Sequence, residues 1–232
     1  FPEYIYLATY LFAALIQIFN FTILIFINIK QPEKVIQKLR PLSEILMQKT
    51  LIIAISAAAV GYSLMSFIMT ATPLQIVNVC KLGDSASATV IQWHVIAMFA
   101  PSFFTGSIIS FLGNRKVMLI GVLFYGLSIF FSLIGQTVPH FWIALFLCGL
   151  GWNFLYIGGS DIIAKCALPE ERAKVQGVTD FIIFIFVATG SFLAGFLHSS
   201  LGWEIMMLYT LVPILLIFIS IIIIRPQEVK VI

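Results

Sequence analysis

Residues 117–135 read VMLIGVLFYGLSIFFSLIG, a run of nineteen residues without a charged side chain. An α-helix rises about 1.5 Å per residue and the hydrocarbon core of a bilayer is about 30 Å thick, so this run is long enough to cross it. In lipid, every backbone N–H and C=O group must find its partner inside the segment, which a helix provides. We therefore predict a transmembrane helix at this position.

Further apolar stretches of the same kind lie on both sides of this run, and none of them contains Lys or Arg. The seven predicted spans are 4–28, 51–79, 90–112, 117–135, 141–164, 177–198 and 204–224. Composition agrees, because 61% of the residues are hydrophobic and only 10% are charged, whereas about a quarter of a soluble domain is charged. The alternating ten-residue segments of a membrane β-barrel are absent. The sequence predicts an all-α integral membrane protein of about seven transmembrane helices.

The basic residues indicate the orientation of these helices, since cytoplasmic loops are enriched in Lys and Arg. If the spans alternate in direction, Lys81 falls on one side and twelve basic residues fall on the other. Those twelve are Lys30, Lys34, Lys38, Arg40, Lys49, Arg115, Lys116, Lys165, Arg172, Lys174, Arg225 and Lys230. We expect the richer side to be cytoplasmic and the residues near Phe1 to lie outside.

Three parts follow from this pattern. Residues 1–29 hold a single predicted transmembrane helix, and residues 30–50 form a basic cytoplasmic linker with one short amphipathic helix. Residues 51–232 hold the other six helices. The chain starts FPEYIY rather than with Met, and its first apolar run has no signal-peptide features. We expect a piece of a longer protein.

An internal repeat lies within the six-helix part. PSFFTGSIISFLGN at 101–114 aligns without gaps with GSFLAGFLHSSLGW at 190–203, at a constant offset of 89 residues. The identical positions are Ser102/Ser191, Phe103/Phe192, Gly106/Gly195, Ser110/Ser199, Leu112/Leu201 and Gly113/Gly202. The two copies end on opposite sides of the membrane, so the unit is three helices inserted once in each direction. Such an inverted 3+3 repeat is typical of secondary transporters; chance similarity among common membrane residues is the alternative.

The joint after the third span resembles the cytoplasmic signature of the major facilitator superfamily. That signature has a Gly, an acidic residue four positions later, and a Gly followed by basic residues. The joint has Gly106, Gly113, Arg115 and Lys116 in these places, while Ser110 replaces the acidic residue. The joint PEERAKVQG at 169–177 is similar to the family's second basic loop, and GLGWNFLYIGGSD at 149–161 looks like a bacterial subgroup.

This resemblance covers residues 30–225 and implies the last six helices of a twelve-helix transporter in a bacterial inner membrane. The first span would then be the sixth helix, and the N-terminal half of the same transporter would be the partner. The family's fold implies that spans 51–79, 90–112, 141–164 and 177–198 line a central cavity. The polar residues Gln92, His94, Asn153, Asp161 and Asp180 all lie on these four spans.

Asp161 and Asp180 are the acidic residues placed well inside predicted helices, each about one turn from the cytoplasmic end. Carboxylates in the membrane are costly and usually paired. Three roles remain open for them: uptake of a proton during transport, a charge clasp with Arg172 or Lys174, or a carboxylate that only extends to the interface. With the signature residues they define a candidate cytoplasmic gate, made of Ser110, Gly113, Arg115, Lys116, Asp161, Arg172, Lys174 and Asp180.

The candidate transport pathway takes its residues from the other polar positions of the lining spans. His94 fits a proton relay or a substrate contact, although a His flanked by Trp93 also fits an interfacial anchor. Asn153 lies near the middle of the membrane among glycines that either allow close helix contact or weaken a gate. Thr70, Thr72 and Pro73 indicate either a helix break or a simple kink. The pathway candidates are Thr70, Thr72, Gln92, His94, Asn153 and Tyr156.

Catalytic and cofactor signatures are missing from the sequence. There is no GxSxG, HExxH or phosphate-binding Gly-rich run, and the three His and three Cys residues lie at different depths. We expect no enzyme, no cofactor, no metal and no nucleic-acid partner. The sequence favours ion- or proton-coupled secondary transport of a small solute by alternating access. A seven-helix receptor or retinal protein is the alternative, although no Lys lies in 204–224 to hold retinal.

Overall fold

The computed structural model describes residues 7–27 and 40–223, and these form helices joined by short turns, without a strand. The chain divides into two units, Phe1–Lys38 and Leu39–Ile232. In the first unit, α1 (Leu7–Phe26) is an apolar helix with no buried residue. A helix that is apolar all round requires lipid or protein against it.

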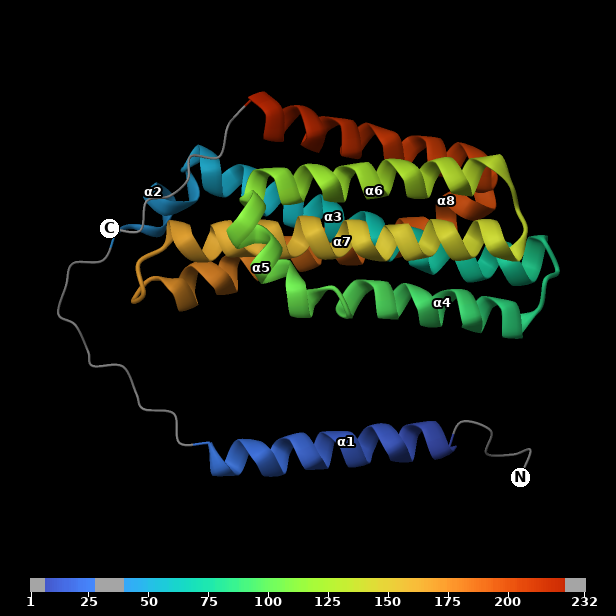
Figure 1. Ribbon diagram of the computed structural model, residues 1–232, viewed down its shortest axis with the longest axis horizontal. Coiled ribbons are helices and arrows are strands. Elements are labelled where there is room, and N and C mark those ends of the chain that lie inside the picture. The colour runs from blue at the N-terminus through green and yellow to red at the C-terminus, as the bar shows by residue number, and fades with distance from the viewer. Residues whose placement is uncertain (1–6, 28–39, 224–232) are drawn as a thin grey trace. The chain divides into compact units, whose positions relative to one another are not determined.

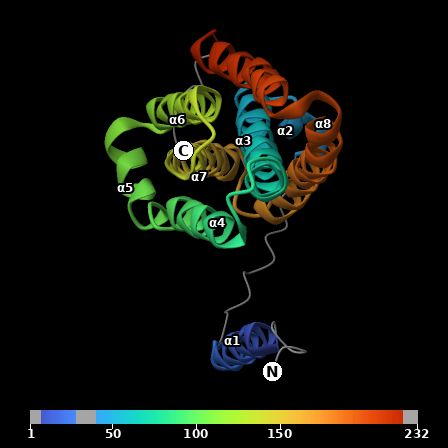
Figure 2. The same ribbon diagram turned by 90° about the vertical axis from the view of Figure 1, so that its right-hand side faces the viewer.

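The second unit is a bundle of helices that run along a common direction (Figure 1). In chain order these are α2 (Leu42–Leu46), α3 (Lys49–Pro73), the π-helix η2 (Leu74–Val79), α4 (Asp84–Phe99), α5 (Ser102–Leu112), α6 (Asn114–Ile134), α7 (Val138–Cys166) and α8 (Arg172–Ile223). α3 and α7 lie in the middle, with α4, α5, α6 and α8 around them (Figure 2).

Five helices of the described residues are long and apolar enough to cross a membrane, or six if the bent pair α4 and α5 is one span. α8 has 52 residues, and at about 1.5 Å per residue it is far longer than one crossing. It changes direction at Gly202, which has φ 76° and ψ 172°, and its two parts lie along the bundle in opposite directions (Figure 1). If α4 and α5 count as one span and the two parts of α8 count as two, the described residues contain the predicted seven crossings.

The predicted span 90–112 differs from the structure at both its start and its middle. Its helix already starts at Asp84, inside the predicted joint, where the acidic side chain in the first turn suits the positive end of the helix dipole. The helix then breaks between Phe99 and Ser102 with a bend of 44°. Pro101 explains the break, because proline has no N–H to donate and crowds the preceding turn.

The predicted division of residues 1–50 stays a prediction. α2 lies inside the range 30–50, but residues 28–39 are outside the described part of the chain. Five of the basic residues that predict the orientation of the helices also lie outside the described part of the chain. These are Lys30, Lys34, Lys38, Arg225 and Lys230.

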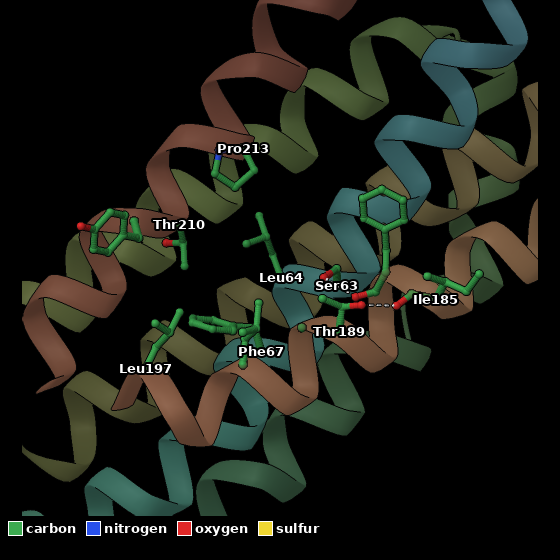
Figure 3. A pocket seen from close by; sticks show the side chains of 12 residues that line it. Ser63, Leu64, Phe67, Ile185, Thr189, Leu197, Thr210 and Pro213 are labelled. Carbon is green, nitrogen blue, oxygen red and sulfur yellow. Dashed lines mark hydrogen bonds between the residues drawn. The ribbon is translucent and has the colours of Figure 1, made fainter. Parts of the chain in front are cut away.

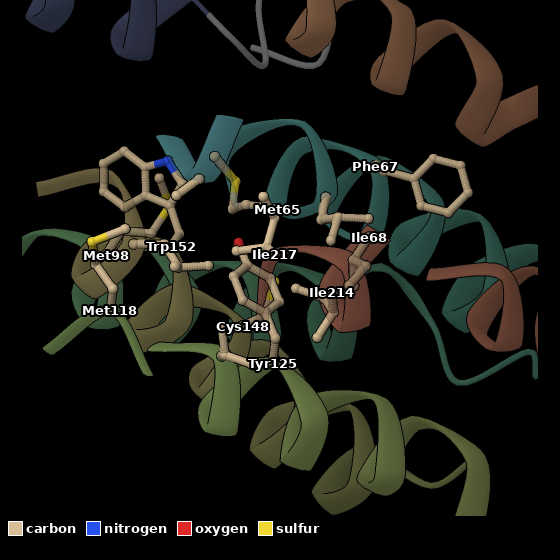
Figure 4. Close-up of a cluster of buried hydrophobic side chains, with 14 of the residues drawn as sticks. Met65, Phe67, Ile68, Met98, Met118, Tyr125, Cys148, Trp152, Ile214 and Ile217 are labelled. Atoms are coloured by element: carbon tan, nitrogen blue, oxygen red, sulfur yellow. The ribbon is translucent and has the colours of Figure 1, made fainter. Parts of the chain in front are cut away.

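Close helix contacts hold α7 at the centre of the bundle. A Cβ atom added at Gly149 would lie 2.7 Å from the His94 carbonyl oxygen, and one at Gly159 would lie 2.8 Å from the Ala54 carbonyl oxygen. Both positions therefore require glycine for α7 to approach α4 and α3. The buried apolar cluster around this contact includes Met65, Met98 and Trp152 (Figure 4).

Candidate functional site

One side of the bundle brings together the four elements that the sequence predicts to line a cavity. α4 and the first part of α8 flank α3 and α7, whereas α6 and the last part of α8 lie on the other side (Figure 2). We call the first side the lining face. Its polar and aromatic residues are the candidates for contact with a solute.

Five aromatic side chains from these four elements meet near the middle of the bundle. The rings of Trp152 and Tyr156 on α7 are stacked, with centroids 5.2 Å apart and planes inclined by 9°. Tyr62 of α3 stands edge-on to both, with centroids 5.3 and 5.2 Å away. Phe99 of α4 contacts Trp152 at 5.7 Å, and Phe184 of α8 contacts Tyr62 at 5.8 Å. We call these five residues the aromatic cluster.

Sequence reasoning named Tyr156 alone from this cluster. Trp152 and Tyr156 are four residues apart, a spacing that places two side chains on the same face of a helix. That spacing was a usable signal for the pair. Tyr62, Phe99 and Phe184 join it only through tertiary packing, for which the sequence holds no comparable signal.

Asn153 is fully buried and forms hydrogen bonds with residues on both sides of the break between α4 and α5. Its Nδ2 donates to the Met98 carbonyl oxygen and to Ser102 Oγ, each at 2.7 Å, and its Oδ1 accepts from Thr105 Oγ1 at 2.6 Å. The break frees backbone carbonyls from their helical partners, and the amide of Asn153 satisfies one of them. The structure thus places this pathway candidate inside the bundle, where it holds a bend.

The remaining pathway candidates are spread along the lining elements. His94 is fully buried between α4 and α7, and its Nδ1 lies 2.7 Å from the Leu145 carbonyl oxygen. Gln92 and Thr70 are exposed, whereas Thr72 is buried with Oγ1 donating to the Ile68 carbonyl oxygen at 2.7 Å. Beyond Pro73 the backbone continues as η2; π-helical turns of this kind are frequent at functional sites.

Asp161 and Asp180 lie near the end of the bundle that carries most of the basic residues. Asp161 forms an ion pair with Lys165 one turn later on α7, and its Oδ2 accepts from Asn114 Nδ2 of α6 at 2.7 Å. Asp180 Oδ1 accepts from Gln176 Nε2 at 2.9 Å. Within the described residues neither carboxylate pairs with Arg172 or Lys174, so the predicted clasp stays a prediction.

The other gate candidates take several positions at this end. Gly113 joins α5 to α6 with φ 81°, and the exposed Ser110 donates through Oγ to the Gly106 carbonyl oxygen. Arg115 binds the end of α8, with Nε 3.1 Å from the Ile221 carbonyl oxygen and Nη2 3.0 Å from that of Ile222. Cations suit the negative C-terminal end of a helix. Lys116, Arg172 and Lys174 are exposed.

Sequence reasoning missed an ion pair that joins Arg40 to Glu171. Arg40 Nη2 lies 2.6 Å from Glu171 Oε2, and both Nε and the backbone N–H of Arg40 donate to Oε1 at 3.1 Å. The Leu168 N–H donates to Oε2 at 3.0 Å. The hydrogen bond from Arg40 lowers the pKa of the Glu171 carboxyl from 4.5 to about 2. Arg40, just before α2, is therefore tied to the turn between α7 and α8.

A polar cluster lies at the opposite end of the bundle. Gln75 of η2 donates through Nε2 to Gln136 Oε1 at 2.8 Å, and its Oε1 lies 2.9 Å from His198 Nε2. Cys80 Sγ lies 3.3 Å from Gln136 Oε1. A cavity of about 320 Å³ opens beside these side chains and is also bordered by Glu204.

The larger cavity, about 510 Å³, lies between α3 and the two parts of α8 (Figure 3). Two of its hydroxyl groups bond to backbone: Ser63 Oγ donates to the Phe186 carbonyl oxygen and Thr189 Oγ1 to that of Ile185, each at 2.8 Å. The cavity therefore presents mainly carbon atoms. No metal-binding group of three or more His, Cys, Asp or Glu occurs in residues 7–27 and 40–223.

Comparison with known proteins gives a consistent result. The family model described as Major Facilitator Superfamily matches residues 51–231. The chain is 45% identical to the riboflavin transporter RfnT of Brucella anthropi over 175 residues, which are 75% of this chain and 44% of that protein. It is 33% identical to the uncharacterized transporter YdeG of Bacillus subtilis over 153 residues, 64% of this chain and 35% of the relative.

A more distant relative is the chloramphenicol resistance protein CraA of Acinetobacter baumannii, 26% identical over 114 residues, 49% of this chain and 28% of the relative. The chain matches less than half the length of each of these relatives. These matches and the apolar helices identify a multi-pass protein of the bacterial inner membrane. They do not favour a seven-helix receptor or a retinal protein.

Proposed function

Since this chain belongs to the major facilitator superfamily, we propose that it forms the C-terminal half of a carrier that moves a small solute across the inner membrane by alternating access. Its partner is the N-terminal half of the same carrier, which would close the lining face into a central pathway. The family match over residues 51–231 is the observation that carries this proposal.

The proposed solute is riboflavin or a closely related flavin. The support comes from the 45% identity to a protein named as a riboflavin transporter. The aromatic cluster on the lining face agrees with a flat heteroaromatic solute, since aromatic rings bind such rings by stacking. Drug export is the second candidate, supported by the 26% identity to a chloramphenicol resistance protein.

Coupling to a proton is the finer part of the proposal. Asp180 lies on α8 close to the lining face and binds the neutral Gln176. A carboxylate inside a membrane-spanning segment is a functional candidate by default, often as part of an ion or proton pathway. Asp180 is our candidate for the coupling residue, because Asp161 is held by Lys165.

The test is an exchange assay with the complete carrier reconstituted in liposomes that contain unlabelled riboflavin. Labelled riboflavin added outside should enter in a saturable manner, and liposomes without protein should show only slow leakage. Labelled chloramphenicol serves as the second solute. Exchange of chloramphenicol without exchange of riboflavin would replace the flavin proposal by drug export, and exchange of neither would refute both.

Net uptake under an imposed pH gradient tests the coupling. Accumulation that collapses when a protonophore is added supports proton coupling. Accumulation that persists with the protonophore would contradict it.

A further inference from the structure

We propose that Tyr62, Trp152 and Tyr156 form a stacking platform for the flat ring of the solute, with Trp152 Nε1–H donating a hydrogen bond to an acceptor on that ring. This inference rests on the proposed function, in which the solute is a flavin. It adds the place where the ring binds and the groups that bind it.

The position of these residues fits a substrate site. In secondary transporters, substrates bind close to the middle of the bilayer. Trp152 is the middle residue of α7, which extends from Val138 to Cys166. Tyr62 lies near the middle of the continuous span Lys49–Val79. The platform therefore sits at the depth where a carrier can expose a solute to either side.

The geometry of the rings leaves one surface for a ligand. Trp152 stacks on Tyr156, and the Tyr62 ring is inclined to these two rings by 71° and 73°. Tyr156 is only partly buried, so a further planar group can stand on the lining face against the side of the stacked pair and contact both rings. Edge-to-face contact of this kind is an arrangement that aromatic rings prefer, and it lets the indole N–H, which lies in the plane of its ring, point at the group.

Two exposed phenylalanines border the platform. Phe99 is 56% exposed and Phe184 is 53% exposed, and they contact Trp152 and Tyr62 respectively. Exposed side chains change rotamer rapidly. Rotation of Phe99 would uncover the indole of Trp152 and let a bound ring approach it, while Phe184 would flank the same ring from α8.

The buried nitrogen of Trp152 is the second, independent observation. Trp152 is 5% exposed, and among the residues that the structure describes its Nε1 has no hydrogen-bond acceptor. Buried donors are almost always paired, so a donor without a partner requires an explanation. A ring carbonyl oxygen or nitrogen of a flavin would supply the missing acceptor.

The chemistry of the cluster also restricts the ligand. All five side chains are uncharged aromatics, so the cluster recognises a flat ring and not a polyol chain. Stacking of a base on an aromatic side chain is worth about 1–3 kcal/mol, which is a change in affinity of about 5- to 150-fold when the side chain is removed.

The experiment measures binding to the complete carrier in lipid nanodiscs by the quenching of flavin fluorescence. The probes are riboflavin, lumichrome (the ring system without the ribityl chain) and ribitol (a polyol without the ring). We expect riboflavin and lumichrome to bind and quench, and ribitol at high concentration not to displace them.

Four variants separate the parts of the platform. Tyr156→Leu removes a ring and should weaken binding by about 5-fold or more, whereas Tyr156→Phe keeps the ring and should bind nearly as well as the unmodified carrier. Trp152→Phe keeps a ring but loses the N–H, and should weaken binding by about tenfold. Phe131→Leu on α6, away from the lining face, is the matched control and should not change binding.

Each outcome decides between the two proposals. If riboflavin binds but Tyr156→Leu and Trp152→Phe bind it unchanged, the platform is wrong and the proposed solute stands. If lumichrome binds through these residues but riboflavin does not, the platform stands and the proposed solute is wrong. If the unmodified carrier binds neither flavin, both are overturned.

Discussion

Gly113 and Gly202 lie 89 residues apart and adopt the same left-handed backbone conformation, with φ of 81° and 76°. Each ends one helix and starts the next without a connecting loop. The phenylalanines ten residues before them, Phe103 and Phe192, are 85% and 80% exposed. The aligned sequences 101–114 and 190–203 thus form matching structures, as the inverted repeat requires.

The first prediction concerns these two glycines. Gly113→Ala and Gly202→Ala should each destabilise the bundle by about 1–2 kcal/mol, because an L-residue is strained at positive φ. An added Cβ would meet no atom within 4 Å at either position, so the effect would come from the backbone alone. Thermal unfolding in detergent measures it.

Gly106→Ala and Gly195→Ala are the matched controls, since an added Cβ is equally free there. Both lie inside helices, where alanine is favoured over glycine by about 1 kcal/mol. A melting temperature that rises in all four variants would contradict the argument from positive φ.

The second prediction concerns the bend held by Asn153. Asn153→Leu keeps the size of the side chain but leaves the Met98 carbonyl oxygen without this donor, while Thr105 Oγ1 keeps the Pro101 carbonyl oxygen as its acceptor. Leaving buried polar groups unpaired costs about 1–3 kcal/mol. Thr105→Val removes only one of these hydrogen bonds and should destabilise the bundle less. Equal melting temperatures for the unmodified carrier and Asn153→Leu would show that the amide does not hold the bend.

The sequence predicted the fold better than the site, and the reason is physical. Crossing a bilayer demands about 20 apolar residues per helix, a signal that no soluble segment imitates. The sequence shows a proline at position 101, but it did not predict the bend there. Proline in a membrane helix produces either a kink or a break, depending on its neighbours. Here Asn153, fifty-two residues later, bonds the Met98 carbonyl oxygen and Ser102 on the two sides of the break.

The site residues show where such reasoning stops. Asp161 and Asp180 were identified because charge inside a span is rare. Glu171 lies in a basic loop among other charged residues, so its position in the sequence did not distinguish it. Its partner Arg40 is 131 residues away. His94 stood out as a polar residue on a lining span, yet the structure buries it fully against α7. Partners distant in sequence follow from packing, which one sequence does not reveal.

The third prediction uses the pH dependence of the Arg40–Glu171 pair. The pKa of Glu171 is lowered from 4.5 to about 2 in the folded protein, so its contribution to stability is complete above pH 4.5 and is lost as the pH falls towards 2. Glu171→Gln should therefore lower the melting temperature at pH 6 and have little effect near pH 2. The expected loss at pH 6 is about 1–3 kcal/mol.

Glu170→Gln is the control for this pair, because Glu170 is the exposed neighbour in the same turn. It should leave the melting temperature unchanged at both pH values. If Glu171→Gln lowers stability equally at pH 6 and near pH 2, the charge of the carboxylate is not what ties Arg40 to this turn.

The last prediction separates the roles of Asp161 and Asp180. Asp161 pairs with Lys165, and the two side chains are 33% and 40% exposed, so the pair is worth at most about 1 kcal/mol and its loss changes a population ratio by up to about fivefold. Both partners lie on α7, so the pair can form in either conformation, and Asp161→Asn should leave exchange and net uptake almost unchanged. Thiol accessibility on the two sides of the membrane, which should match that of the unmodified carrier, checks this.

Asp180 binds the neutral Gln176 among the contacts of the described residues, and it is the coupling carboxylate in our proposal. Asp180→Asn should keep riboflavin exchange, which needs no net proton movement, but lose accumulation driven by a pH gradient. Gln176→Leu is the matched control: it removes the hydrogen bond and keeps the carboxylate, so accumulation should persist. If both aspartate variants transport and accumulate as the unmodified carrier does, the two carboxylates only extend to the interface, and proton coupling must lie elsewhere in the carrier.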